Sequence, residues 1–472
     1  MTLRGFELRR PGAPGLFAIA LGVWSAMVAL MPSTNGRLLL VIPLVLTTLF
    51  YWIILRPSRW LGAFFFCLLL LQPLPMPLGN SGVHVAPLFA LLGGLAGLVW
   101  IREWRSWSHP LTLALVIFCS VLVESLAFAA IFSGGEIALG SLARVILFAI
   151  SILVFLYSYA GPRGDGWSPF RITKFLFGLA VAGALFACVD FYFQFPAPAG
   201  YGDQFVYLEE GVFRRAQGLF YEASTLGNLC AFFLVMIMVC LFRRREETPL
   251  SRAVLQAGGL VLAAALLFSY SRASVLNVVV AAAVLACLHA GRVRRSVIVL
   301  LAALAAAGGA IQLAAPKLSA NYWGRLLGSF SYFDQSPDQV LSGRLGHWQI
   351  LDDFLAREPW YAVFGIGYKT LPYSNFIGSK VIADNTYLGL LVETGVVGLA
   401  AFIALNAVIL RTGWIARRSP RPEAQFFGEW IFCFWCGEVV QMLSGDLITY
   451  WRVLPVYFWA LGTAARLTRE DP

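Results

Sequence analysis

The feature that most constrains this chain is a succession of apolar blocks, each about 17 to 25 residues long, separated by short polar stretches. A helix of that length crosses the roughly 30 Å hydrocarbon core of a membrane. Only 13% of the residues are charged, against about 25% in a typical soluble domain. A soluble enzyme is therefore excluded.

Fourteen blocks are candidate membrane spans. They lie at about 16–32, 38–55, 60–73, 84–101, 110–132, 141–160, 173–195, 221–242, 250–268, 273–290, 296–315, 385–410, 425–445 and 449–466. The third is short and runs into a proline-rich segment from Gln72 to Pro77, which favours a bent or re-entrant helix. Because backbone groups in lipid must be paired within each segment, we expect an all-α polytopic membrane protein with about 12 to 14 transmembrane helices.

The basic residues predict the orientation of these spans. If the N-terminus is cytoplasmic, 23 of the 35 Lys and Arg residues fall in the termini and loops on that side, as the positive-inside rule requires. The net charge of +10 therefore reflects topology, and we expect membrane lipids but no nucleic acid as partners. The charge pattern predicts a multi-pass membrane protein with both termini on the cytoplasmic side.

The cysteines indicate no metal site. Cys433 and Cys436 form a CxxC pair inside an expected span, without a second pair. A structural zinc ion needs four ligands, so these thiols are interpreted as small core residues. We expect neither a metal nor another cofactor.

Two long outer loops divide the chain. The expected regions are 1–195 (N-terminal helices), 196–220 (periplasmic loop), 221–315 (central helices), 316–384 (large periplasmic loop) and 385–472 (C-terminal helices). In the large loop, Trp348, Leu351 and Leu355 recur at helical spacing, which predicts a short amphipathic helix over 343–355. Such a helix lies on the membrane surface or covers a cavity.

Arginines precede the span that begins near residue 221. Arg214 and Arg215 are followed by Glu222. Arginine presents a planar fork that holds phosphate oxygens in pairs, so a pyrophosphate is one candidate ligand. The alternative is a solvated ion-pair network with Glu209 and Glu210.

A short outer turn carries Tyr270 and Arg272 between two spans. An unpaired charge so close to hydrocarbon is unfavourable, which predicts that Arg272 faces a polar cavity or a ligand. The alternative is that its side chain extends to the membrane interface.

Asp384 and Asn385 come directly before another span. Either side chain can cap the helix that follows. A carboxylate at this position can also act as a general base on an acceptor hydroxyl. Four further acids fall in or beside expected spans and are interpreted as interhelical polar contacts, with Asp190 the best placed to line a cavity: Glu124, Asp190, Glu438 and Asp446.

Taken together and in this order, these motifs resemble the O-antigen ligase and polysaccharide polymerase family of bacterial membrane glycosyltransferases. The matching positions run from about residue 200 to 410: Arg214, Arg215, Gly218, Tyr270, Ser271, Arg272, Arg344, Trp348, Pro359, Gly365, Gly367, Asn385, Tyr387, Leu388, Glu393 and Gly395. Each motif is short, so the specificity of the resemblance comes from their combination.

The resemblance implies a helical bundle with a periplasmic cavity that takes a polyprenyl-pyrophosphate-linked glycan. It implies that Arg214, Arg215 and Arg272 hold the pyrophosphate while a metal-independent displacement inverts the anomeric carbon. Further candidates for binding the substrates are Tyr270, Arg344 and Asn385. The candidate catalytic residues are Asp384, His347 and Glu222.

One departure from the family pattern concerns the acceptor. Lipopolysaccharide ligases have a histidine at or near the position before the asparagine, where this chain has Asp384. Asp384 or His347 then serves as base, or no strong base is needed. This favours a polymerase of O-antigen or exopolysaccharide repeats over a ligase, with a glycan or lipid acceptor and a chain-length regulator as a candidate partner. The alternative class is a transporter or flippase of lipid-linked sugars, although the two similar halves typical of transporters are not evident.

Overall fold

The computed structural model describes residues 13–55, 59–74, 83–105, 107–162, 168–196, 204–208, 211–289 and 344–469. Seven α-helices form the N-terminal part of this described chain: α1 (Ala13–Leu30), α2 (Thr34–Leu55), α3 (Arg59–Leu70), α4 (Ala86–Val99), α5 (Pro110–Ser133), α6 (Gly135–Ala160) and α7 (Pro169–Phe193). The remaining helices are α8 (Ala223–Phe242), α9 (Arg252–Phe268), α10 (Arg272–Leu288), α14 (Arg344–Arg357), α15 (Tyr361–Phe364), α16 (Thr386–Arg417), α17 (Pro422–Gln441) and α18 (Leu454–Arg469).

The predicted all-α membrane fold is confirmed. Every span expected within the described residues contains a helix, whereas the span expected at 296–315 lies outside them. In the part of the chain that the structure describes, six helices are long and apolar enough to cross a membrane: α5, α6, α7, α8, α16 and the segment Pro422–Ser444 that includes α17. The protein is therefore a multi-pass membrane protein.

The short third span has a structural counterpart. Helix α3 has 12 residues and is about 18 Å long, too short to cross the hydrocarbon core alone. It packs beside the 14-residue α4. Gly93 of α4 lies directly on the Trp60 ring, where a Cβ would come within 2.4 Å of the indole. The Tyr157 hydroxyl donates to the Gly93 carbonyl oxygen at 2.8 Å, so Gly93 permits close helix approach.

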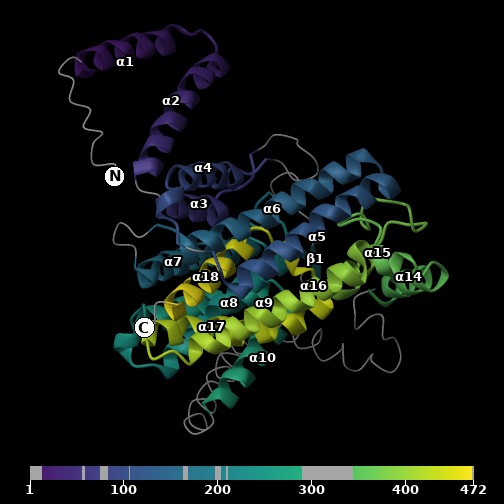
Figure 1. The fold of residues 1–472 in the computed structure, drawn as a ribbon. Helices are drawn as coiled ribbons and strands as arrows, with labels where there is room; N and C mark the ends of the chain where they lie inside the picture. Colours follow the sequence, from purple (N-terminus) through teal and green to yellow (C-terminus); the bar gives the residue numbers. More distant parts are fainter. Residues whose placement is uncertain are drawn as a thin grey trace.

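The helices from α5 onward form one bundle, whereas α1 and α2 extend away from it (Figure 1). Within the bundle α18 packs against α6, and α17 packs against α10 and α16. We call the end at which α8, α10, α16 and α18 begin the outer end, because the basic residues predict that it faces away from the cytoplasm.

A buried polar network joins four helices near the outer end, α8, α10, α17 and α18. The amides of Asn228 (α8) and Asn277 (α10) both donate to one carboxylate oxygen of Glu438 (α17), at 2.7 and 2.8 Å. The same two amides donate to Gln441 Oε1 at 3.1 Å, and the Tyr457 hydroxyl donates to Asn228. Glu438 is therefore the interhelical polar contact that the sequence predicts.

The first outer loop contains a small hairpin that the sequence did not indicate. Strand β1 (Phe205–Leu208) pairs antiparallel with β2 (Gly211–Arg214). The hairpin is tied to the end of α7 by Gln194, whose side-chain oxygen accepts from the Arg214 amide at 2.8 Å. In the second loop, α14 confirms the predicted amphipathic helix, and Leu351 on its apolar stripe is fully buried.

Candidate functional site

Residues 215–218 dock onto the turn between α9 and α10. The Ala216 amide donates to the Phe268 carbonyl oxygen at 2.9 Å, and Arg215 Nε donates to the Ser269 carbonyl oxygen at 2.8 Å. Gly218 has φ +56°, and a Cβ there would lie 2.8 Å from the Ala187 methyl of α7. Glycine is therefore required at this position, and the docked segment brings Arg215 to the turn that carries Arg272.

The turn itself is a compact, strained structure. Tyr270 is buried and has φ +49°, a left-handed conformation that is uncommon for a non-glycine residue. Ser271 is the N-cap of α10, its hydroxyl lies 2.8 Å from that of Ser274, and Arg272 is the first helical residue. A helix N-terminus carries partial positive charge, so the turn, Arg215 and Arg272 make a region suited to an anion.

Glu222 lies next to this region, at the N-cap position of α8. The Ser224 hydroxyl donates to its carboxylate at 3.0 Å. Burial raises the pKa of Glu222 above its ordinary value, and the negative charge of Asp384 acts in the same direction. The positive charges of Lys369 and Arg215 lower it. The charges of Asp384, Lys369 and Arg215 therefore all act on Glu222. Of these four residues, only Lys369 was not predicted from the sequence.

Lys369 is the functional candidate that the sequence motifs missed. It is buried, has φ +55°, and forms an ion pair with Asp446. Burial lowers the pKa of Lys369, whereas the neighbouring carboxylates of Glu393, Glu222 and Asp384 raise it. The only signal in the sequence was that Lys369 is one of just four lysines and lies two residues after the Gly-Ile-Gly segment.

The Gly365-Ile366-Gly367 segment holds the Lys369 loop in place. Gly365 and Gly367 have φ +75° and +112°, and a Cβ on Gly367 would lie 2.4 Å from the Ala129 Cα of α5. The Gly367 amide donates to the Glu393 carbonyl oxygen of α16 at 2.8 Å. Both glycines serve close packing and left-handed backbone conformation, which gives this motif a structural explanation.

Helix α14 covers the segment that leads into α16. Arg344 Nε lies 3.1 Å from a carboxylate oxygen of Asp384, and the Trp348 indole donates to the Ala383 carbonyl oxygen at 2.7 Å. His347 Nδ1 lies 2.9 Å from the Ile382 carbonyl oxygen. Since a carbonyl can only accept, that nitrogen carries a proton, and in the neutral imidazole Nε2 is then the acceptor.

Asn385 and Asp384 have different environments. The Asn385 side-chain oxygen accepts from the Tyr387 and Leu388 amides at 3.0 and 3.1 Å, which makes Asn385 the N-cap of α16. Asp384 has φ +44° and pairs with Arg344 instead. Asn385 therefore caps α16, whereas the Asp384 carboxylate forms an ion pair with Arg344.

The two adjacent arginines also have separate environments. Arg214 donates to Asp190 Oδ1 and to the Phe195 carbonyl oxygen, both at 2.8 Å. The alternative network with Glu209 and Glu210 falls on residues outside the described ranges. Thus the structure brings Arg215, Glu222, Lys369 and Asp384 together and directs Arg214 toward α7.

Comparison with known families supports the reading of the motifs. Residues 257–403 match the family model described as O-Antigen ligase. This region includes the turn with Arg272, helix α14, the Lys369 loop and the first half of α16. No curated protein matches the chain. The match supports the predicted resemblance to the O-antigen ligase and polymerase family, and a ligase- or polymerase-type membrane enzyme.

The different roles of Asn385 and Asp384 can be tested by thermal unfolding of the purified protein in detergent. Asn385→Ala removes the cap of α16 and is expected to destabilise the fold by about 1 kcal/mol. The neighbouring Asp384→Asn keeps a side chain that tolerates positive φ and loses only a partly exposed ion pair, so its midpoint should match the wild type. Equal midpoints for both variants would contradict the assignment of the cap.

Proposed function

We propose that the protein transfers a glycan from a polyprenyl pyrophosphate carrier to a hydroxyl acceptor at the periplasmic face of the bacterial inner membrane. The observation that supports this most strongly is the gathering of Arg215, Glu222, Lys369 and Asp384 from separate segments at the outer end. Such a cluster combines groups that bind an anion with groups that accept a proton, as glycosyl transfer from a pyrophosphate requires.

The proposed reaction is a single displacement. The acceptor hydroxyl oxygen attacks the anomeric carbon on the face opposite the pyrophosphate, so the configuration inverts. The bond from the anomeric carbon to the pyrophosphate oxygen breaks, its electron pair leaves with the pyrophosphate, and the hydroxyl proton passes to a base. Arg215 and Arg272 stabilise the charge that develops on the leaving group, so the proposal requires no metal ion.

Among the three candidate catalytic residues, we assign proton acceptance to Glu222. Its side chain is partly buried in the electrostatic environment of Arg215, and its raised pKa makes it a stronger base than an exposed glutamate. Asp384 is paired with Arg344, and His347 keeps Nε2 available. We place these two on the acceptor side, where they orient the attacking hydroxyl.

For the acceptor, we favour polymerisation of O-antigen or exopolysaccharide repeat units. The residue before Asn385 is an aspartate, unlike the histidine of lipopolysaccharide ligases, so transfer to a lipopolysaccharide core ranks second. A polymerase of this kind would work with a chain-length regulator as partner.

The leaving-group assignment is tested with purified protein and a polyprenyl-pyrophosphate oligosaccharide. The wild type should release polyprenyl pyrophosphate and lengthen the glycan. Arg215→Ala and Arg272→Ala should each lower turnover by about 100-fold or more, whereas Arg357→Ala, at an exposed position on α14, should not. Near-normal turnover in both variants would contradict the assignment. Lipid movement between leaflets without release would support a flippase.

The pH dependence of kcat/KM tests the base. Glu222 must be ionised to accept a proton, so activity should fall as pH decreases through its raised pKa. Lys369 favours the ionised form, so Lys369→Gln should raise that pKa and move the acid limb up by about 0.5 to 1 pH unit. Lys380→Gln, at an exposed position in the same loop, is the matched control. An unchanged limb in Lys369→Gln, or full activity in Glu222→Gln, would rule out Glu222 as the base.

A further inference from the structure

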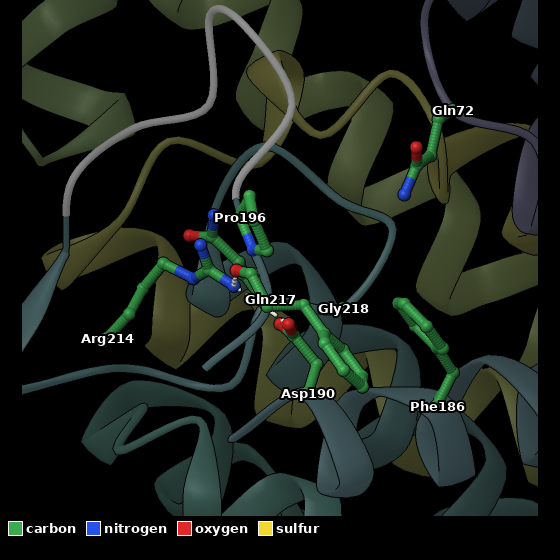
Figure 2. A pocket seen from close by; sticks show the side chains of 8 residues that line it. Gln72, Phe186, Asp190, Pro196, Arg214, Gln217 and Gly218 are labelled. Carbon is green, nitrogen blue, oxygen red and sulfur yellow. Dashed lines mark hydrogen bonds and ion pairs between the residues drawn. The ribbon is translucent and has the colours of Figure 1, made fainter. Parts of the chain in front are cut away.

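A cavity of about 240 Å³ opens at the outer end of α7, beside the docked segment (Figure 2). Its lining comes from one residue after α3, from α7 and the residues that follow it, and from the end of β2 and the docked segment: Gln72, Phe186, Asp190, Phe195, Pro196, Arg214, Gln217 and Gly218. The proposed reaction places no group in this cavity. The volume is comparable to that of one monosaccharide.

Gln217 is the residue that indicates a ligand. Its side chain is 1% exposed, and within the described part of the chain neither its amide nitrogen nor its amide oxygen has a hydrogen-bond partner. A buried amide without partners is costly, because it has given up its hydrogen bonds to water. Figure 2 shows Gln217 beside the Arg214–Asp190 pair, at one side of the cavity. Gln217 therefore offers both a donor and an acceptor to a bound molecule.

The charges in the cavity favour a neutral ligand. Arg214 Nη2 lies 2.8 Å from Asp190 Oδ1, so the formal charges of the two side chains compensate each other. An anion would have to displace the aspartate from the guanidinium, whereas a hydroxyl group can use the remaining donors and lone pairs of both. Arg214 Nε, which has no partner among the described residues, is one such donor.

Part of the lining is apolar. The rings of Phe186 and Phe195 are nearly parallel, with centroids 6.5 Å apart and planes inclined by 18°, and Pro196 also lines the cavity. A few placed polar groups facing aromatic walls are typical of small-ligand sites. A pyranose fits both sides, because its hydroxyl edge pairs with amide, carboxylate and guanidinium groups while its C–H face packs on an aromatic ring.

The position of the cavity connects it to the proposed reaction. Gln217 is two residues after Arg215, which faces the Ser269 carbonyl oxygen of the turn. We propose that this cavity is a sugar subsite, which holds one neutral pyranose of the glycan while Arg215 and Arg272 hold the pyrophosphate. This proposal rests on the proposed function, because that function supplies the donor or acceptor glycan from which the sugar comes. Binding of a free sugar to the cavity can nevertheless be measured without turnover.

Saturation-transfer-difference NMR on the full chain in detergent tests binding with four probes: glucose, galactose, N-acetylglucosamine and glucuronic acid. At least one neutral sugar should receive saturation from the wild type. Gln217→Leu, which keeps the side-chain size, should reduce that signal by about fivefold or more. Gln256→Leu, the same change at an exposed position near the start of α9, should leave it unchanged. No transfer to any of the four sugars, or equal transfer in Gln217→Leu, would overturn the subsite.

Asp190→Asn and the wild type together test whether the cavity selects a neutral ligand. In Asp190→Asn a neutral sugar loses a strong acceptor, so its signal should decrease, whereas glucuronic acid should gain signal because Arg214 loses its compensating charge. If glucuronic acid receives more saturation than every neutral sugar from the wild type, the cavity is an anion site and the proposal is overturned.

Turnover measurements then assign the sugar to its source. In Gln217→Leu, an increase of KM for the lipid-linked donor alone places a donor sugar in the cavity, and an increase for the acceptor alone places an acceptor sugar there. An unchanged KM for both would overturn the role of the cavity in the reaction. Saturation transfer that persists in a protein without polyprenyl pyrophosphate release would leave the subsite standing and refute the proposed function.

Discussion

The hydrogen bonds from Asn228 and Asn277 to Glu438 are the interaction on which the outer face of this protein depends. No water is available within a bilayer, so buried polar groups must find partners inside the protein. Here one carboxylate joins α8, α10 and α17, and two of these helices begin at functional candidates, Glu222 and Arg272. The network thereby fixes the relative positions of the proposed base and one proposed leaving-group ligand.

The proposed chemistry follows from how charge is divided at the outer end. Arg215 donates a hydrogen bond to the turn before α10, where the N-terminus of that helix adds partial positive charge. Lys369 lies among carboxylates and keeps Glu222 more acidic than burial alone would make it. Arg214, adjacent in sequence to Arg215, is compensated by Asp190. Two neighbouring arginines can therefore serve different parts of one substrate, the pyrophosphate and the glycan.

Features that depend on local sequence were predictable. The length of the apolar blocks predicted the spans, and helical spacing predicted α14. Polar side chains before an apolar run predicted a helix cap at 384–385, and in the structure Asn385 forms that cap. Features that depend on distant segments were not. Lys369 becomes a functional candidate only through its ion pair with Asp446 and its electrostatic interaction with Glu222, and both residues lie far away in sequence. The separate partners of Arg214 and Arg215 depend on how a short hairpin packs against α7, which hydropathy cannot show.

A cryo-EM structure of the purified protein with bound polyprenyl pyrophosphate tests whether Arg215 and Arg272 form the pyrophosphate site at the outer end. We expect diphosphate oxygens within about 3 Å of both guanidinium groups, with Arg214 still paired to Asp190. A diphosphate bound to Arg214 with the Asp190 pair broken, or bound away from the turn before α10, would contradict this site.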